Sequence, residues 1–106
     1  MDIIIKSNEL NALYVQAAGR LDLDTAVEYG TKVKDTIEDS DITVTEVVLD
    51  FSQITFISSF GLKIVLELYK FMKERNGVLK LKGVSEKLMS SFRMVGFDKF
   101  LVFENV

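Results

Sequence analysis

The stretch from Glu46 to Met72 constrains the fold of this chain most strongly. It begins with three consecutive β-forming residues, Val47 to Leu49, and it ends in an apolar helical run. β-Forming residues without polar alternation are typical of a strand buried on both faces, as in the middle of a parallel sheet. The residues from Asp50 to Ile57 are expected to form a short loop. The stretch therefore predicts a central strand that leads through a loop into a helix.

Two serines, Ser58 and Ser59, stand where this loop meets the helix. Hydroxyl side chains commonly cap helix N-termini, and the isolated turn favours this structural interpretation. A helix N-terminus also presents unpaired N–H groups and a partial positive charge, so it tolerates added negative charge. We therefore expect the junction of loop and helix to be the place where chemistry or regulation is located.

The helix is predicted from about Ser59 to Arg75, with Asn76-Gly77 as its stop signal. It carries two adjoining apolar stripes, whereas a helix that packs one side onto a sheet needs only one. The first stripe consists of Leu62, Val65, Leu66, Tyr69 and Met72, and the second consists of Phe60, Ile64, Leu68 and Phe71. The second stripe is either covered by a neighbouring helix or left open for a partner.

Strands and one further helix are predicted before this stretch. Ile3–Ile5 and Leu13–Ala18 favour an antiparallel pair of strands, and Gly19 is expected to end the second. Thr25 and Glu28 then have the spacing of a capping box at the start of a first helix. The core-facing residues of this helix are expected to be Ala26, Gly30, Val33 and Ile37, with Gly30 allowing close packing against the sheet.

After the central stretch the chain continues in the same alternation. The alternating residues Val78–Lys82 predict a strand, and Ser85 is expected to cap a third helix that ends at Gly96. Phe100–Phe103 predicts a last short strand. The predicted order β-β-α-β-α-β-α-β indicates an α/β fold with a mixed sheet.

Composition limits the class of protein. The chain has 106 residues, of which 48% are hydrophobic and 27% charged, so we expect one globular domain over residues 1–106. Its net charge of −3 argues against a nucleic-acid-binding domain, in which basic residues dominate. No apolar run approaches a membrane span, and without an export signal the expected location is cytoplasmic.

Histidine and cysteine are absent from the sequence. This excludes Ser-His-Asp and Cys-His nucleophilic systems, and zinc sites built from thiolates or imidazoles, within this chain. Asp22, Asp24 and Asp50 could hold a hard cation, but the first two are better explained by the helix start and Asp50 by backbone N–H groups. Ser59 and Lys63 are better explained as surface residues than as a nucleophilic pair. We therefore expect a non-enzymatic protein without a metal.

Three segments, in their order and spacing, resemble the STAS domain family. They are GRLDLDTA after the second strand, then VVLDFSQITFISSFGLKIVL, then a glycine followed by an LKL strand. The resemblance extends from Leu13 to Phe103 and is greatest to the stand-alone anti-sigma factor antagonists of bacteria. In that family a serine at the start of the second helix is phosphorylated by a partner kinase, which is also the anti-sigma factor. The unphosphorylated form binds this partner and frees a sigma factor.

The resemblance implies roles for individual residues. Alignment of the family motif Asp-Ser-Ser/Ala-Gly-Leu on Gly61-Leu62 places the phosphorylated serine on Ser59, while Ser58 replaces the aspartate and Phe60 replaces a small residue. The implied partner is an anti-sigma factor serine kinase, which would supply nucleotide and metal, so no cofactor is expected. The implied partner-binding residues are Arg20, Asp22, Asp24, Ser58, Ser59, Phe60 and Lys63.

Two alternatives stay open at this stage. The first keeps the fold but not the phosphorylation switch: an interaction or homodimerisation module that uses Phe60, Ile64 and Phe71. An apparent molecular mass in solution that rises with protein concentration, without phosphorylation, would favour it. The second is a small-ligand-binding α/β domain with a pocket near Ser58 and Ser59, which a co-purifying ligand would favour.

Overall fold

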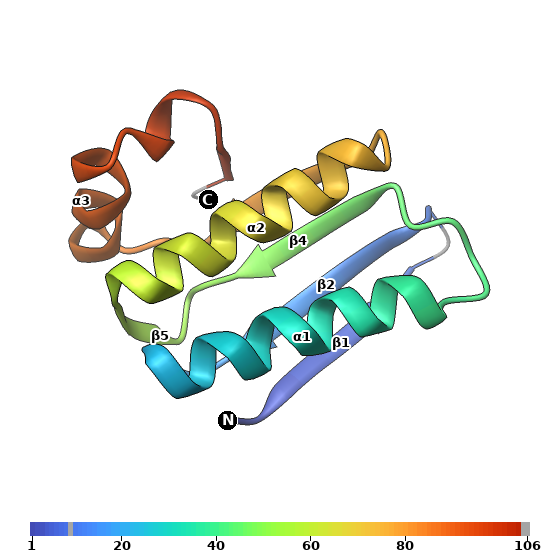
Figure 1. Ribbon diagram of the computed structural model, residues 1–106, viewed down its shortest axis with the longest axis horizontal. Helices are drawn as coiled ribbons and strands as arrows, with labels where there is room; N and C mark the ends of the chain where they lie inside the picture. Colours follow the sequence, from blue (N-terminus) through green and yellow to red (C-terminus); the bar gives the residue numbers. More distant parts are fainter. Residues whose placement is uncertain (9, 105–106) are drawn as a thin grey trace.

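The unbroken apolar strand predicted at Val47–Leu49 lies at the centre of a mixed sheet (Figure 1). The computed structural model describes residues 1–8 and 10–104. In chain order the elements are β1 (Ile3–Ser7), β2 (Ala12–Ala17), β3 (Gly19–Leu21), α1 (Leu23–Asp39), β4 (Glu46–Asp50), β5 (Ile54–Ile57), α2 (Ser59–Glu74), β6 (Val78–Lys82), α3 (Glu86–Met94), the 3-10 helix η1 (Phe97–Lys99) and β7 (Val102–Glu104). The α/β class and the alternation of helices and strands are as predicted.

The main sheet has the strand order β1-β2-β4-β6-β7. β1 runs antiparallel to β2, and all the other neighbours are parallel. β4 therefore has a parallel partner on each side, and Val47, Val48 and Leu49 are at most 4% exposed. This burial explains why the strand lacks polar alternation.

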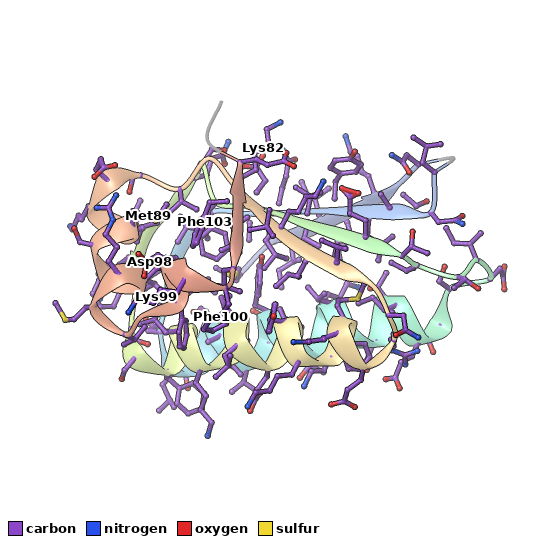
Figure 2. The ribbon with its side chains drawn as sticks, turned by 90° about the horizontal axis from the view of Figure 1, so that it is seen from above. Lys82, Met89, Asp98, Lys99, Phe100 and Phe103 are labelled. Carbon is purple, nitrogen blue, oxygen red and sulfur yellow. The ribbon has the colours of Figure 1, made fainter. Side chains whose placement is uncertain are left out.

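The two long helices, α1 and α2, lie side by side on one face of this sheet (Figure 1). Figure 2 shows the two layers edge-on, with Lys82 on the side of the sheet away from these helices. In the described part of the chain, that second face carries no helix (Figure 1 and Figure 2). None of the helices within residues 1–8 and 10–104 has the length and apolar character needed to cross a membrane.

A second, smaller sheet was not predicted. β3 and β5 pair in parallel, so Gly19 begins a strand instead of ending one, and Asp50–Ile57 is not a loop throughout. Both strands are short, and each depends on a partner more than thirty residues away in sequence. Local propensity alone therefore gave little signal for them.

The pairing of α1 with α2 decides what happens to the second stripe of α2. Ile64 and Leu68 are buried, and Gly30 of α1 lies so close to Ile64 that a Cβ on Gly30 would be 2.8 Å from its Cγ2 atom. Gly30 therefore permits close contact with α2, and not with the sheet as predicted. The stripe is covered by α1 at its centre, which removes Ile64 from any open dimerisation surface.

Aromatic side chains connect the helices to the end of the chain. Tyr29, Phe51, Phe92 and Phe103 form a series with successive ring-centroid distances of 6.4, 6.3 and 5.3 Å. Tyr29 is fully buried, and its hydroxyl has no hydrogen-bond partner among the described residues. Burial, with a smaller contribution from the charge of Asp50, raises the pKa of Tyr29 far above its ordinary value. The hydroxyl is therefore neutral.

The last strand begins later than predicted. Phe100 belongs to the turn after η1 and packs on Tyr69 of α2, with 5.1 Å between the ring centroids (Figure 2). β7 begins only at Val102. The aromatic residues of this segment were predicted to be in a strand because they favour strands locally, but here Phe100 is used to pack the end of the chain against α2.

Candidate functional site

The two adjacent serines at the start of α2 have different environments. Ser58 is the N-cap residue: its Oγ accepts a hydrogen bond from the Gly61 N–H at 3.1 Å. The backbone N–H of Ser58 donates to the Leu21 carbonyl at 2.9 Å. Ser59 is the first residue of the helix and is exposed, and its hydroxyl has no hydrogen-bond partner in residues 1–8 and 10–104. The helix cap therefore needs Ser58 but not Ser59.

Gly61 allows the start of α2 to lie directly on β3. A Cβ on Gly61 would be 2.7 Å from the Leu21 carbonyl oxygen and 2.7 Å from Cγ1 of Ile57. Since real Cβ atoms do not approach so closely, a larger residue would push α2 away from both strands. The glycine thus fixes the distance between Ser59 and the Gly19–Asp24 segment.

The Gly19–Asp24 segment comprises β3, the N-cap residue Asp22 and the first residues of α1. The β3–β5 pairing puts Arg20 opposite Phe56, and the guanidinium carbon lies 4.0 Å from the centre of that ring. Arg20 also forms a 3.9 Å ion pair with Asp22, and both side chains are substantially exposed. The pairing therefore presents a cation on an aromatic ring near the start of α2.

The capping box of α1 is formed by different residues from those predicted. Asp22, and not Thr25, is the N-cap, and its Oδ1 accepts from the Thr25 N–H at 3.5 Å. The Asp22 N–H in turn donates to Thr25 Oγ1 at 3.0 Å. Glu28 was expected to complete the box, but it forms an ion pair with the Met1 amine at 3.2 Å. Asp24 lies exposed in the first turn, where the helix dipole favours a negative charge.

Phe60 and Lys63, three residues apart, lie on the side of α2 that faces α1. Phe60 is half-buried and lines a groove of about 270 Å³ between the two helices, together with Val27. Lys63 extends over its ring, with 5.8 Å from Nζ to the centroid. Phe60 therefore fills part of the space between the helices and leaves Ser59 exposed.

Three apolar residues at this end of the molecule were not predicted to belong to the site. Leu23 and Val27, one turn apart on α1, are 61% and 46% exposed. Their spacing places them on one side of the helix, outside the predicted core stripe, and this pattern was the available signal. Phe56, which lies under Arg20, was also not singled out.

Asp50 has the structural role that was expected. It ends β4 and accepts hydrogen bonds from the Ser52 N–H at 2.9 Å and from Gln16 Nε2 at 3.2 Å. Partial burial raises the pKa of its carboxyl, but these hydrogen bonds and the charge of Lys82 outweigh it and hold the pKa below its ordinary value. Within the described residues, no three carboxylates gather as metal ligands.

Comparison with known proteins gives one consistent result. The chain matches the family model described as "Mlab, STAS domain" over residues 6–103. It is 26% identical over 107 residues to the anti-sigma-B factor antagonist of Listeria monocytogenes, covering 100% of this chain and 90% of that protein.

Two solved structures extend the comparison to the fold. An anti-sigma factor antagonist from Mycobacterium paratuberculosis has a TM-score of 0.81 at 20% identity, covering 96% of this chain and 83% of that one. The Bacillus cell fate determinant SpoIIAA in its phosphorylated form has a TM-score of 0.75 at 17% identity, covering 99% and 91%. At these identities the two structures establish a shared fold.

Proposed function

This chain belongs to the STAS domain family, and on that premise we propose that it is an anti-sigma factor antagonist. In this role the protein acts by binding, without catalysis of its own. The start of α2 and the Gly19–Asp24 segment bind an anti-sigma factor, and this binding releases a sigma factor. The similarity to the antagonist of Listeria monocytogenes along the whole chain supports the proposal. The place of action would be the bacterial cytoplasm.

The proposed partner is an anti-sigma factor that is also a serine kinase, and its target on this chain is Ser59. The kinase brings the nucleotide and metal, so the chain needs no cofactor. Phosphorylation of Ser59 weakens the complex and returns the anti-sigma factor to its sigma factor. The existence of SpoIIAA in a phosphorylated form, on the same fold, supports this mechanism.

One observation carries the proposal: the hydroxyl of Ser59 is exposed and unused, because Ser58 caps the helix. Phosphorylation of Ser58 would instead attach the phosphate to the oxygen that accepts the hydrogen bond from the Gly61 N–H. Ser59 can accept a phosphate and keep the Ser58–Gly61 hydrogen bond intact.

Electrostatics explain why phosphorylation of Ser59 would weaken the complex and not the free protein. A phosphate adds between about one and two negative charges beside the N-terminus of α2, whose partial positive charge stabilises them in the free protein. The same charge in a packed interface would meet desolvation and repulsion, which cost several kcal/mol in order of magnitude. Phosphorylation therefore disfavours the complex much more than it disfavours the monomer.

The test is the intact mass of the protein before and after incubation with ATP, magnesium and the candidate anti-sigma factor kinase. We expect one phosphate on the wild type and none on Ser59→Ala. Ser58→Ala is the matched control, since it loses the neighbouring hydroxyl and weakens the cap but keeps the acceptor. Phosphate on Ser59→Ala would place the acceptor elsewhere.

A binding assay with the same kinase separates the two parts of the proposal. A kinase that binds the wild type without phosphorylating it would leave a constitutive antagonist, the first alternative considered above. A kinase that neither binds nor phosphorylates it would contradict the proposed function.

A further inference from the structure

Among the described residues, the groove between α1 and α2 is bridged by ion pairs at one end and is open, without such pairs, at the other. Beyond Gly30, towards the C-terminal ends, two ion pairs join the helices: Lys34 to Glu67 at 4.0 Å, and Glu38 to Arg75 at 3.6 Å. On the N-terminal side of Gly30, no ion pair between the two helices is found within the described residues. This open end is the one next to Ser59.

Apolar side chains occupy the open end. Leu23 and Val27 of α1 are 61% and 46% exposed, and Val27 and Phe60 line the groove from opposite sides. Ile64, packed against Gly30, forms the floor. We call Leu23, Val27 and Phe60 the Leu23–Phe60 surface. Exposed apolar residues are common singly, but a group beside a groove is typical of an interaction surface.

Lys63 gives this surface a charge. Its ammonium lies over the Phe60 ring and has no carboxylate partner in the part of the chain that the structure describes. Glu67, four residues further along the same face of α2, is paired with Lys34. A partner that covers the groove would therefore gain by placing a carboxylate opposite Lys63.

Continuity with Ser59 indicates which partner this is. Phe60 follows Ser59 directly in the first turn of α2, so a kinase whose active site encloses Ser59 comes within one residue of the Leu23–Phe60 surface. The two surfaces therefore belong to one interface.

We propose that the Leu23–Phe60 surface is a docking site for the same anti-sigma factor, which inserts an apolar side chain into the groove and places a carboxylate opposite Lys63. This inference rests on the proposed function and extends its contact area from the Gly19–Asp24 segment along α1 to Val27.

Lys63 then contributes to the switch. Ser59 and Lys63 are four residues apart on α2, the spacing at which opposite charges on a helix attract each other. A phosphate on Ser59 attracts the Lys63 ammonium and repels the partner carboxylate that it would otherwise bind. Phosphorylation thus removes one contact of the complex in addition to adding charge.

The first test measures the affinity of the candidate anti-sigma factor kinase for the wild type, Val27→Asp and Val102→Asp. The two valines are 46% and 43% exposed, but Val102 lies on β7, so the substitutions are matched in chemistry and exposure. We expect Val27→Asp to weaken binding about tenfold or more, as for a buried interface residue, and Val102→Asp to change it less than about twofold.

Leu23→Asp is the second variant, since an acid in the first turn of α1 suits the helix dipole and preserves folding. Circular dichroism establishes that each variant is folded. Wild-type affinity in both folded variants would overturn the docking site and remove Leu23 from the contact made by the Gly19–Asp24 segment. Binding of the wild type would still support the proposed function. Absence of binding by the wild type itself would contradict the proposed function, and the docking site with it.

The second test addresses Lys63. The loss of affinity caused by Ser59→Asp is measured in the wild type and in Lys63→Gln. We expect a smaller fold-change in the Lys63→Gln background, because the contact that the charge disrupts is already absent. An equal fold-change in both backgrounds would exclude Lys63 from the switch.

Discussion

At the level of single residues, the cap and the candidate acceptor at the start of α2 are separate side chains. Ser58 has extended backbone angles (φ −85°, ψ 172°), which direct its Oγ back to the Gly61 N–H. Ser59 is already helical, so its side chain points outward to solvent. Both serines were identifiable from the sequence, but their separate roles were not, because these depend on the residue at which the helix begins.

Gly61 is the glycine at which an added Cβ would come closest to a backbone atom. In Gly61→Ala, the new methyl group would meet the Leu21 carbonyl oxygen at 2.7 Å, and a backbone atom cannot rotate away. We expect a loss of about 1–3 kcal/mol in the free energy of unfolding, measured by urea denaturation. A midpoint equal to that of the wild type would show that α2 can move off β3 without cost.

Substitution of Tyr29, unlike that of Gly61, is expected to stabilise the protein. Its buried hydroxyl has no partner among the described residues, so Tyr29→Phe should raise the free energy of unfolding by about 1 kcal/mol. Tyr14→Phe is the control, since the exposed Tyr14 hydroxyl accepts a hydrogen bond from Asn8 and its loss should not stabilise the protein. Thermal unfolding of both variants tests this expectation. A lower stability of Tyr29→Phe would mean that the Tyr29 hydroxyl of the wild type does form a hydrogen bond.

At the level of elements, the sequence allowed the long segments to be predicted and the short ones to be missed. β4 and α2 each carry their own signal, an unbroken apolar run and a repeated apolar stripe. β3 and β5 exist only because they pair with each other, so neither is visible in its own residues. The same limit applies to the start of α1, where Asp22 and Thr25 are both good caps and the tertiary position of β3 selects Asp22.

Asp50, at the C-terminal end of β4, should make the stability of the protein depend on pH. Burial alone would raise the pKa of Asp50, but hydrogen bonds from Ser52 and Gln16 and the nearby charge of Lys82 lower it overall. A carboxyl whose pKa is lower in the folded state contributes stability above its unfolded pKa, and this contribution is lost as the pH falls through the folded pKa.

Wild-type protein should therefore lose more stability than Asp50→Asn when the pH falls from about 5 to about 2, since the amide cannot titrate. Urea midpoints measured for both proteins across this range give the comparison. Parallel pH profiles would show that Asp50 has the same pKa folded and unfolded.

At the level of the whole molecule, alternation of strands and helices was sufficient to predict the α/β class, and the strand–helix junction was sufficient to locate the candidate site. The sequence could not indicate how the two long helices meet. That arrangement buries Ile64 and leaves Val27 exposed, so it determines which apolar residues are core and which are surface. Both outcomes follow from the approach of α2 to Gly30, a contact between distant segments.

A binding switch requires that the added charge be harmless to the monomer, and Ser59→Asp tests this requirement directly. The exposed side chain lies at the N-terminus of the 16-residue helix α2, so a carboxylate there should leave the melting temperature unchanged or raise stability by about 0.3–1 kcal/mol. Binding to the candidate anti-sigma factor kinase should fall at the same time. Ser90→Asp adds the same charge to an exposed serine of α3, away from any helix N-terminus, and should leave binding unchanged. If Ser59→Asp lost stability and binding together, the charge would damage the fold, and Ser59 would be a structural residue instead of a switch.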